Sequence, residues 1–187
     1  MEDPKIIQDQ ARESMEAAIM FLDDTLAHIR AGKASVRVLD PIRIDYYGQM
    51  SPLSAVATIT TPDARSIAIQ PWDRKMIGDI ERAIINSNIG FAPSNNGEII
   101  RLTFPPLTEE RRREIVKDVK KLGEESKVAI RNIRRDMVDK LKKIEKDENL
   151  PEDAVKDNQD KIQKVTDKYT DNIDKAVADK EKEVMTV

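Results

Sequence analysis

The sequence predicts an α+β fold in which an elongated three-helix bundle carries a small β/α/β domain inserted between its first and second helices. Three long segments, about residues 2–31, 108–147 and 151–184, repeat apolar residues every three or four positions, as helices with one buried face do. Residues 32–104 instead carry short β-branched runs separated by Gly and Pro. Charged residues make up 36% and aromatic residues 4%, which favours long helices with narrow apolar stripes.

The first helix is predicted over about residues 2–31, with Gly32 as its stop. Its apolar stripe consists of Ile7, Ala11, Met15, Ala18, Leu22, Thr25 or Leu26, and Ile29. A single stripe of this width indicates a helix that packs against others along one face.

The second helix is predicted to begin at Thr108, whose hydroxyl can cap it, while Glu109 and Glu110 suit the positive end of the helix dipole. Pro105 and Pro106 keep the chain extended just before it. The apolar spacing continues for about 40 residues, or roughly 60 Å at 1.5 Å per residue. A rod of this length needs packing partners.

The third helix follows a short break at residues 148–150, with Pro151 in its first turn. It repeats apolar positions every seven residues, as do the other two helices. The three stripes therefore predict one bundle that is discontinuous in sequence, formed by residues 1–31 and 105–187.

Inside the insert we expect strands near residues 42–46, 57–60, 66–69 and 99–104. One helix is predicted near 73–86, with Met76, Ile77, Ile80, Ala83 and Ile84 on its buried face. A turn is predicted over Pro93–Gly97. Trp72 and Phe91 are expected to pack in the core of the insert, with base stacking as the alternative role.

Two connections join the insert to the bundle, at residues 30–34 and 104–107. Their sequence predicts a double linker that acts as a hinge, formed by Ala31, Gly32, Lys33, Ala34, Phe104, Pro105 and Pro106. The alternative is a fixed corner in which the prolines serve only as helix stops.

The net charge of -3 gives no global sign of nucleic-acid binding, so any such surface must be local. Only the second helix is appreciably basic, and Ser126–Lys143 carries seven basic residues against two acidic ones. On a helical projection one flank collects Arg113, Lys117, Lys120, Lys127, Arg131, Arg134, Arg135 and Lys142, whereas Asp118, Glu125, Asp136 and Asp139 fall on the other.

This segregation of charge predicts binding to a phosphate backbone, and the arginines can hold phosphate oxygens in pairs. One alternative is a charge-rich face that is simply solvated. Another is that Arg131 or Arg135 pairs with acids of a neighbouring helix.

The sequence offers little material for catalysis. There is no cysteine, and His28 is the only histidine, so neither a catalytic triad nor a His/Cys metal cluster can form. The glycines do not follow either nucleotide-binding spacing. We therefore expect a protein that is not an enzyme and holds no metal or cofactor. With no apolar run of about 18 residues and no targeting segment, it is expected in the cytoplasm, away from membranes. It is also expected to be a monomer.

Four motifs resemble those of the ribosome recycling factor family, and the likeness runs from end to end. They are Arg30-Ala31-Gly32-Lys33-Ala34-Ser35, Pro105-Pro106-Leu107-Thr108-Glu109-Glu110-Arg111-Arg112, Arg131-Asn132-Ile133-Arg134-Arg135-Asp136 and Asp179-Lys180-Glu181-Lys182-Glu183. The chain departs from the family pattern at Ala31, at Lys33 and at the bulkier Met137-Val138, where Val138 is expected on the cationic flank.

The resemblance implies an L-shaped protein whose bundle binds large-subunit rRNA between the ribosomal subunits, while the insert faces the small subunit. It implies that Arg131, Arg134 and Arg135 hold rRNA phosphates, supported by Arg30 near the hinge. It also implies that elongation factor G is the partner and uses the GTP, and that the two factors together split post-termination ribosomes. The alternative from another class is a helical adaptor that binds a protein through its long rod and does not bind RNA.

Overall fold

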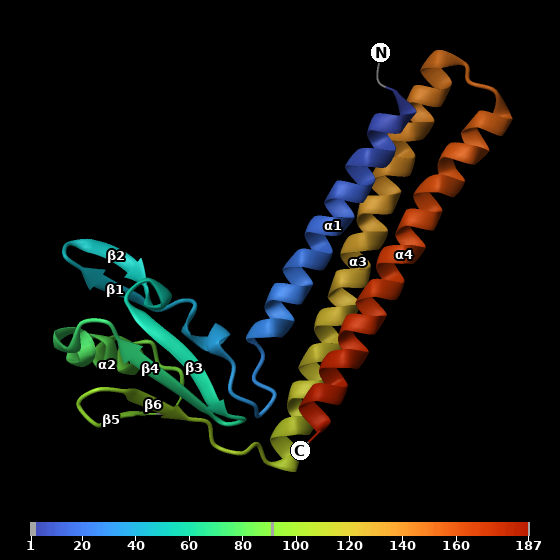
Figure 1. Ribbon diagram of the computed structural model, residues 1–187. Coiled ribbons are helices and arrows are strands. Elements are labelled where there is room, and N and C mark those ends of the chain that lie inside the picture. The colour runs from blue at the N-terminus through green and yellow to red at the C-terminus, as the bar shows by residue number, and fades with distance from the viewer. Residues whose placement is uncertain (1–2, 91, 187) are drawn as a thin grey trace. The chain divides into compact units, whose positions relative to one another are not determined.

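A computed structural model describes residues 3–90 and 92–186. Its helices are α1 (Pro4–His28), α2 (Ile77–Asn86), α3 (Glu109–Glu148) and α4 (Glu152–Met185). Its strands are β1 (Arg43–Tyr46), β2 (Gln49–Pro52), β3 (Ala57–Asp63), β4 (Ser66–Pro71), β5 (Pro93–Asn95) and β6 (Ile100–Thr103). The predicted class, a helical bundle with a small antiparallel-sheet domain between its helices, is confirmed (Figure 1).

The chain divides into two compact units. The bundle unit consists of the residues up to Ile29 together with Arg113–Thr186, and the insert unit consists of Arg30–Arg112. The second division therefore falls inside the first turn of α3, whereas the sequence placed it next to Phe104. Both linkers belong to the insert unit because their contacts are made there.

In the bundle unit, α1, α3 and α4 lie side by side (Figure 1). The predicted stripe of α1 is buried at Ile7, Ala11, Met15, Leu22 and Leu26. At one end of the unit Ile7 packs with Leu141, Ile144 and Ile162, and Val138 is half-buried against this cluster. Val138, which was expected on the cationic flank, therefore has only part of its side chain exposed there.

A small residue lets α3 and α4 pack closely. A Cβ added at Gly123 would lie 2.6 Å from Cγ2 of Val177, a distance that no ordinary packing allows. The absence of a side chain at Gly123 is thus what permits this contact between the two helices.

The helix ends follow from local hydrogen bonds. α1 ends at His28, three residues before the predicted end, because Ile29 is already extended and donates its N–H to the Leu26 carbonyl at 3.2 Å. The predicted cap of α3 is confirmed, since Thr108 Oγ1 accepts the Arg111 N–H at 3.2 Å. Pro151 is the N-cap of α4 and lies just before the helix, not in its first turn.

The insert unit contains a β1–β2 hairpin and a four-stranded antiparallel sheet in the order β3-β4-β6-β5. Its core is formed by buried residues of the sheet, of α2 and of the linker, among them Ile67, Ile69, Ile80, Ile84, Ile100, Leu102 and Phe104. The predicted buried face of α2 is confirmed at Ile80 and Ile84, with Met76, Ile77 and Ala83 packed beside them. Residues 74–76 form a 3₁₀ turn that precedes α2.

Several details of the insert differ from the prediction. β2 was not predicted, and Pro93–Asn95, predicted as part of a turn, forms β5 beside β6. Trp72 is 67% exposed, so its assignment to the core is wrong, and its indole N–H donates to Thr58 Oγ1 at 3.0 Å. Phe91 lies outside the described residues.

Both linkers are bonded to the same turn between β3 and β4. The Ala34 N–H donates to the Ala64 carbonyl at 2.7 Å, and the Phe104 N–H donates to the Arg65 carbonyl at 2.7 Å. The Asp63 carboxylate accepts the Arg65 N–H at 2.9 Å, a bond that lowers the pKa of Asp63. The two linkers are therefore joined to each other through this turn.

Candidate nucleic-acid interface

The cationic flank predicted on α3 consists of two rows in the structure. An inner row, Lys120, Lys127 and Arg134, repeats every seven residues and faces α4. An outer row contains the remaining exposed cations of the flank, Arg113, Lys117, Arg131, Arg135 and Lys142. The two rows differ in what they contact.

The first two inner-row cations form ion pairs with α4. Lys127 Nζ lies 2.5 Å from Asp174 Oδ1 and 3.5 Å from Glu124 Oε1, and its side chain is 21% exposed. The hydrogen bond that Lys127 donates to the Asp174 carboxylate raises the pKa of Lys127 above its ordinary value. Lys120 Nζ lies 3.9 Å from Glu181 Oε1. The charge of Lys127 is thus largely committed to holding the two helices together.

Arg134 is held differently. Its Nη1 donates to Oε1 of Gln163, and the amide nitrogen of the same glutamine donates to Asp167 Oδ1 at 2.7 Å. The partners on α4 also recur every seven residues, since Glu181, Asp174 and Asp167 run opposite Lys120, Lys127 and Arg134. We call this arrangement the ladder. It has an ion pair at two rungs and an intervening amide at the third.

The outer row lies along roughly 43 Å of α3, from Arg113 to Lys142, at 1.5 Å per residue. Arg135 Nε lies 3.7 Å from Asp136 Oδ1, a pair in which both side chains are more than 60% exposed. The Arg131 side chain forms no hydrogen bond or ion pair with any residue in the described ranges. Exposed guanidinium groups of this kind are suited to phosphate oxygens.

Arg30 lies in the insert unit, half-buried beside the linkers. Its guanidinium carbon is 5.6 Å from the centroid of the Phe104 ring, and a Cβ added at Gly90 would come 3.5 Å from its Nη1. Burial, together with the nearby charge of Arg111, lowers the pKa of Arg30. Arg30 and Phe104 therefore bring the two linkers into contact.

The remaining linker residues have distinct environments. Ala31 is buried, whereas Lys33, Pro105 and Pro106 are exposed. Gly32 has a φ of 83°, a conformation that favours glycine, and a Cβ added there would lie 3.5 Å from the Leu107 side chain. Hinge motion at these residues stays a prediction.

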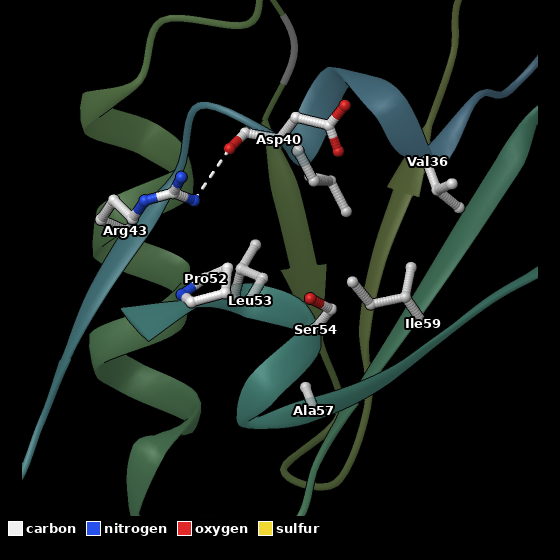
Figure 2. A pocket seen from close by; sticks show the side chains of 9 residues that line it. Val36, Asp40, Arg43, Pro52, Leu53, Ser54, Ala57 and Ile59 are labelled. Carbon is white, nitrogen blue, oxygen red and sulfur yellow. Dashed lines mark hydrogen bonds between the residues drawn. The ribbon is translucent and has the colours of Figure 1, made fainter. Parts of the chain in front are cut away.

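A pocket of about 590 Å³ lies in the insert unit, between the 3₁₀ turn Val36–Leu39 and strand β3 (Figure 2). Its polar lining comes from Asp40, Arg43 and Ser54, and Arg43 Nη1 donates to the Asp40 carbonyl at 3.0 Å. Neither histidine nor cysteine lines it, and these polar groups do not pair as nucleophile and base. The pocket offers no arrangement that suggests a reaction.

Within residues 3–90 and 92–186, no three His, Cys, Asp or Glu side chains are grouped so as to hold a metal ion. No helix of the described chain combines the length and apolar character needed to cross a membrane.

Sequence reasoning missed Gln163 and Asp167. The available signal was the seven-residue spacing shared by the cations of α3 and the acids of α4, which predicts opposed rungs between antiparallel helices. The only sequence signal for Gln163 is that it lies four residues before Asp167, and therefore on the same face of the helix.

These features define a class: a discontinuous three-helix bundle with an inserted antiparallel-sheet domain and a row of exposed cations on the longest helix. The family model for ribosome recycling factor matches residues 22–185. The chain is 57% identical to the ribosome-recycling factor of Phocaeicola vulgatus, over all of both chains. It is 52% identical to that of Porphyromonas gingivalis, over 95% of this chain and 96% of the relative.

Two solved structures are also similar. A solution structure of a ribosome recycling factor matches with a TM-score of 0.83 and 37% identity, over all of both chains. The second matches with a TM-score of 0.68 and 39% identity, over 99% of this chain and all of the other. It comes from models for the T. thermophilus ribosome recycling factor and the E. coli elongation factor G bound to the E. coli post-termination complex. The chain belongs to the ribosome recycling factor family.

Proposed function

We propose that this protein binds the post-termination ribosome and, with elongation factor G and GTP, promotes its splitting into subunits and its release from mRNA. Membership of the family supports the role, as does the similarity to a recycling factor described together with elongation factor G on the post-termination complex. The observation that carries the proposal is the outer row of exposed cations on α3.

The outer row is the proposed anchor on large-subunit rRNA. A cation that contacts a phosphate releases condensed counterions, so affinity falls as salt rises, by a slope that grows with each contact. Arg131 and Arg135 can each present a planar fork to phosphate oxygens. We place Arg134 with them because its hydrogen bond to a neutral amide leaves its charge uncompensated.

The proposed mechanism is differential binding. The protein stabilises a ribosomal state with weakened intersubunit bridges, while the partner GTPase supplies the energy and binds the nucleotide. The insert, which we place toward the small subunit, swings at residues 30–34 and 104–107. The bonds from Ala34 and Phe104 to one turn support motion of the insert as a single body.

The test replaces Arg131 by alanine. Because the Arg131 side chain forms no hydrogen bond or ion pair within the described chain, Arg131→Ala should leave stability unchanged while weakening binding to purified 50S subunits. The slope of log affinity against log salt should fall in magnitude by about one. Subunit splitting with elongation factor G and GTP should slow in parallel.

Lys143→Ala is the matched control, since Lys143 is an exposed cation on another side of the same helix. It should bind and split ribosomes like the wild type. Equal affinity and equal slope for Arg131→Ala and the wild type would sink the proposed anchor. Failure of the wild-type protein to sediment with 50S subunits would favour the protein-adaptor alternative.

A further inference from the structure

We infer that Gln163 of α4 is a positioning residue: its side-chain amide holds the Arg134 guanidinium in place without neutralising it, which leaves Arg134 charged for a phosphate. The inference rests on the proposed function, since it concerns how the anchor on rRNA is prepared. It assigns to α4 a part in a surface that the sequence placed on α3 alone.

The rungs of the ladder differ in the group that faces each cation of α3. Lys127 and Lys120 each have a carboxylate opposite them, Asp174 at 2.5 Å and Glu181 at 3.9 Å. The same register puts Asp167 opposite Arg134, yet Arg134 forms no ion pair with any described residue. Gln163 occupies the space between the guanidinium and that carboxylate.

The side-chain amide of Gln163 forms a hydrogen bond on each side. A glutamine side chain carries both an acceptor and donors, so it can accept from a guanidinium at its oxygen and donate to a carboxylate at its nitrogen. Gln163 does both, accepting from Arg134 Nη1 and donating to Asp167 Oδ1 at 2.7 Å. The bond to Asp167 therefore sets which end of the amide faces Arg134.

The bond to Gln163 leaves the positive charge of Arg134 uncompensated. The amide is neutral, so Arg134 keeps its full charge, whereas the charge of Lys127 is compensated by Asp174. A guanidinium has five N–H donors, and Arg134 uses only one group, Nη1, within the described chain. The others stay available for a bidentate contact with phosphate oxygens. A side chain held in advance also loses less freedom on binding.

The decisive variant is Gln163→Glu, which puts a carboxylate of the same shape against Arg134. It should weaken binding to purified 50S subunits and lower the magnitude of the salt slope by about one, because the phosphate contact is replaced by an internal ion pair. Arg134→Ala is expected to have the same effect, since it removes the charge itself. Gln163→Ala should also weaken binding, since it removes the positioning bond and opens the space between Arg134 and Asp167.

Asn172→Asp is the matched control. It makes the same amide-to-carboxylate change at an exposed position nine residues along α4, roughly half a turn around the helix from Gln163. It should leave affinity and slope close to those of the wild type. Thermal unfolding followed by circular dichroism should give similar midpoints for all of these variants.

The outcomes separate this inference from the proposed function. If Gln163→Glu binds like the wild type, or no worse than Asn172→Asp, the inference is overturned. If Arg131→Ala weakens binding while Arg134→Ala and Gln163→Glu do not, the anchor stands and the role of Gln163 is overturned. If none of the arginine variants changes affinity, the proposed function itself fails.

Discussion

Gly123 of α3 lies against Val177 of α4, with no room for a Cβ atom between them. Alanine is favoured over glycine within a helix by about 1 kcal/mol, so a glycine there is costly unless packing requires it. The distance of 2.6 Å from an added Cβ to Val177 Cγ2 is such a requirement. Valine is branched at Cβ and has few alternative rotamers, so α4 would have to move.

Gly123→Ala is expected to destabilise the bundle by up to about 2 kcal/mol, since overpacking costs about 1–3 kcal/mol and the helix preference for alanine offsets about 1 kcal/mol of it. Chemical denaturation followed by circular dichroism measures the change. Gly78→Ala is the control, because Gly78 lies in α2 with nothing within 4 Å of an added Cβ. It should be neutral or stabilising, and an equal response of both variants would contradict the packing argument.

Glu145 is a carboxyl group buried on α3, 7% exposed, and its Oε1 has no hydrogen-bond partner within the described chain. Burial raises its pKa, against the opposing effects of a hydrogen bond from Gln159 and of the charge of Lys142. A raised pKa means that folding favours the protonated form. The stability that this group contributes is therefore present at low pH and lost as pH rises through the raised pKa.

Glu145→Gln should therefore stabilise the protein more at pH 7 than at pH 4, where the wild-type carboxyl is already largely protonated. Urea unfolding at the two pH values measures the difference in stability between variant and wild type. Glu148→Gln, at an exposed position one turn of the helix away, is the control and should show a small effect. A difference between Glu145→Gln and wild type that is equal at both pH values would rule out the burial explanation.

At the scale of the elements, the ladder joins α3 to α4 through charges that sequence alone assigned to RNA. Lys127 is the clearest case, since its ammonium group lies between Asp174 and Glu124 and its side chain is mostly covered. It belongs to the bundle's internal contacts. Arg131, four residues further along α3, is exposed.

Lys127→Met and Asp174→Asn should each destabilise the bundle, with a coupling energy of about 0.5–1 kcal/mol in a double-mutant cycle. Unfolding in urea measures this coupling energy. Urea is used because it is uncharged and, unlike guanidinium chloride, does not screen the ion pair. Binding of Lys127→Met to 50S subunits should fall less than that of Arg131→Ala. The opposite result would be additive destabilisation by the two changes together with a large loss of 50S binding for Lys127→Met. That result would show that Lys127 contacts RNA and does not pair with Asp174.

At the scale of the whole molecule, the chain forms two units with separate cores and passes between them twice. The insert unit has its own buried cluster around Ile67, Ile84 and Leu102. Its two ends are fastened to one turn by the backbone bonds of Ala34 and Phe104. Units with their own core and adjacent ends are commonly able to fold alone.

A fragment of residues 30–112 is therefore expected to fold by itself, with a cooperative thermal transition. Hydrogen exchange should find the amides of Ala34 and Phe104 protected in the fragment as in the full chain. Phe104→Ala should destabilise it by about 3–5 kcal/mol, because that side chain is 1% exposed. A fragment with rapidly exchanging amides throughout would show that the insert depends on the bundle.

The sequence by itself determined the parts of this protein that depend on local order. Three such parts were predicted correctly: the cap at Thr108, the buried face of α2, and the apolar stripe of α1 that includes Ile7, Ala11 and Met15. Each follows from the 3.6-residue period of a helix or from a bond between near neighbours, and both are properties of a short stretch of chain. The gathering of cations on one flank of α3 follows from the same period.

The strands were predicted less completely, for reasons visible in particular residues. The β1–β2 hairpin turns at Tyr47 and Gly48, with φ values of 51° and 84°, and tyrosine is not a residue that predicts such a turn. β5 contains Pro93, which is uncommon in strands and is tolerated here because β5 is an edge strand beside β6.

Only the tertiary structure decided which cations of the flank stay available. Lys127 and Arg134 lie seven residues apart in equivalent places, yet one meets Asp174 and the other meets Gln163. The difference depends on the register between α3 and α4, which is set by packing such as that of Gly123 against Val177. Those contacts join residues far apart in the chain, and no local pattern of residues specifies them.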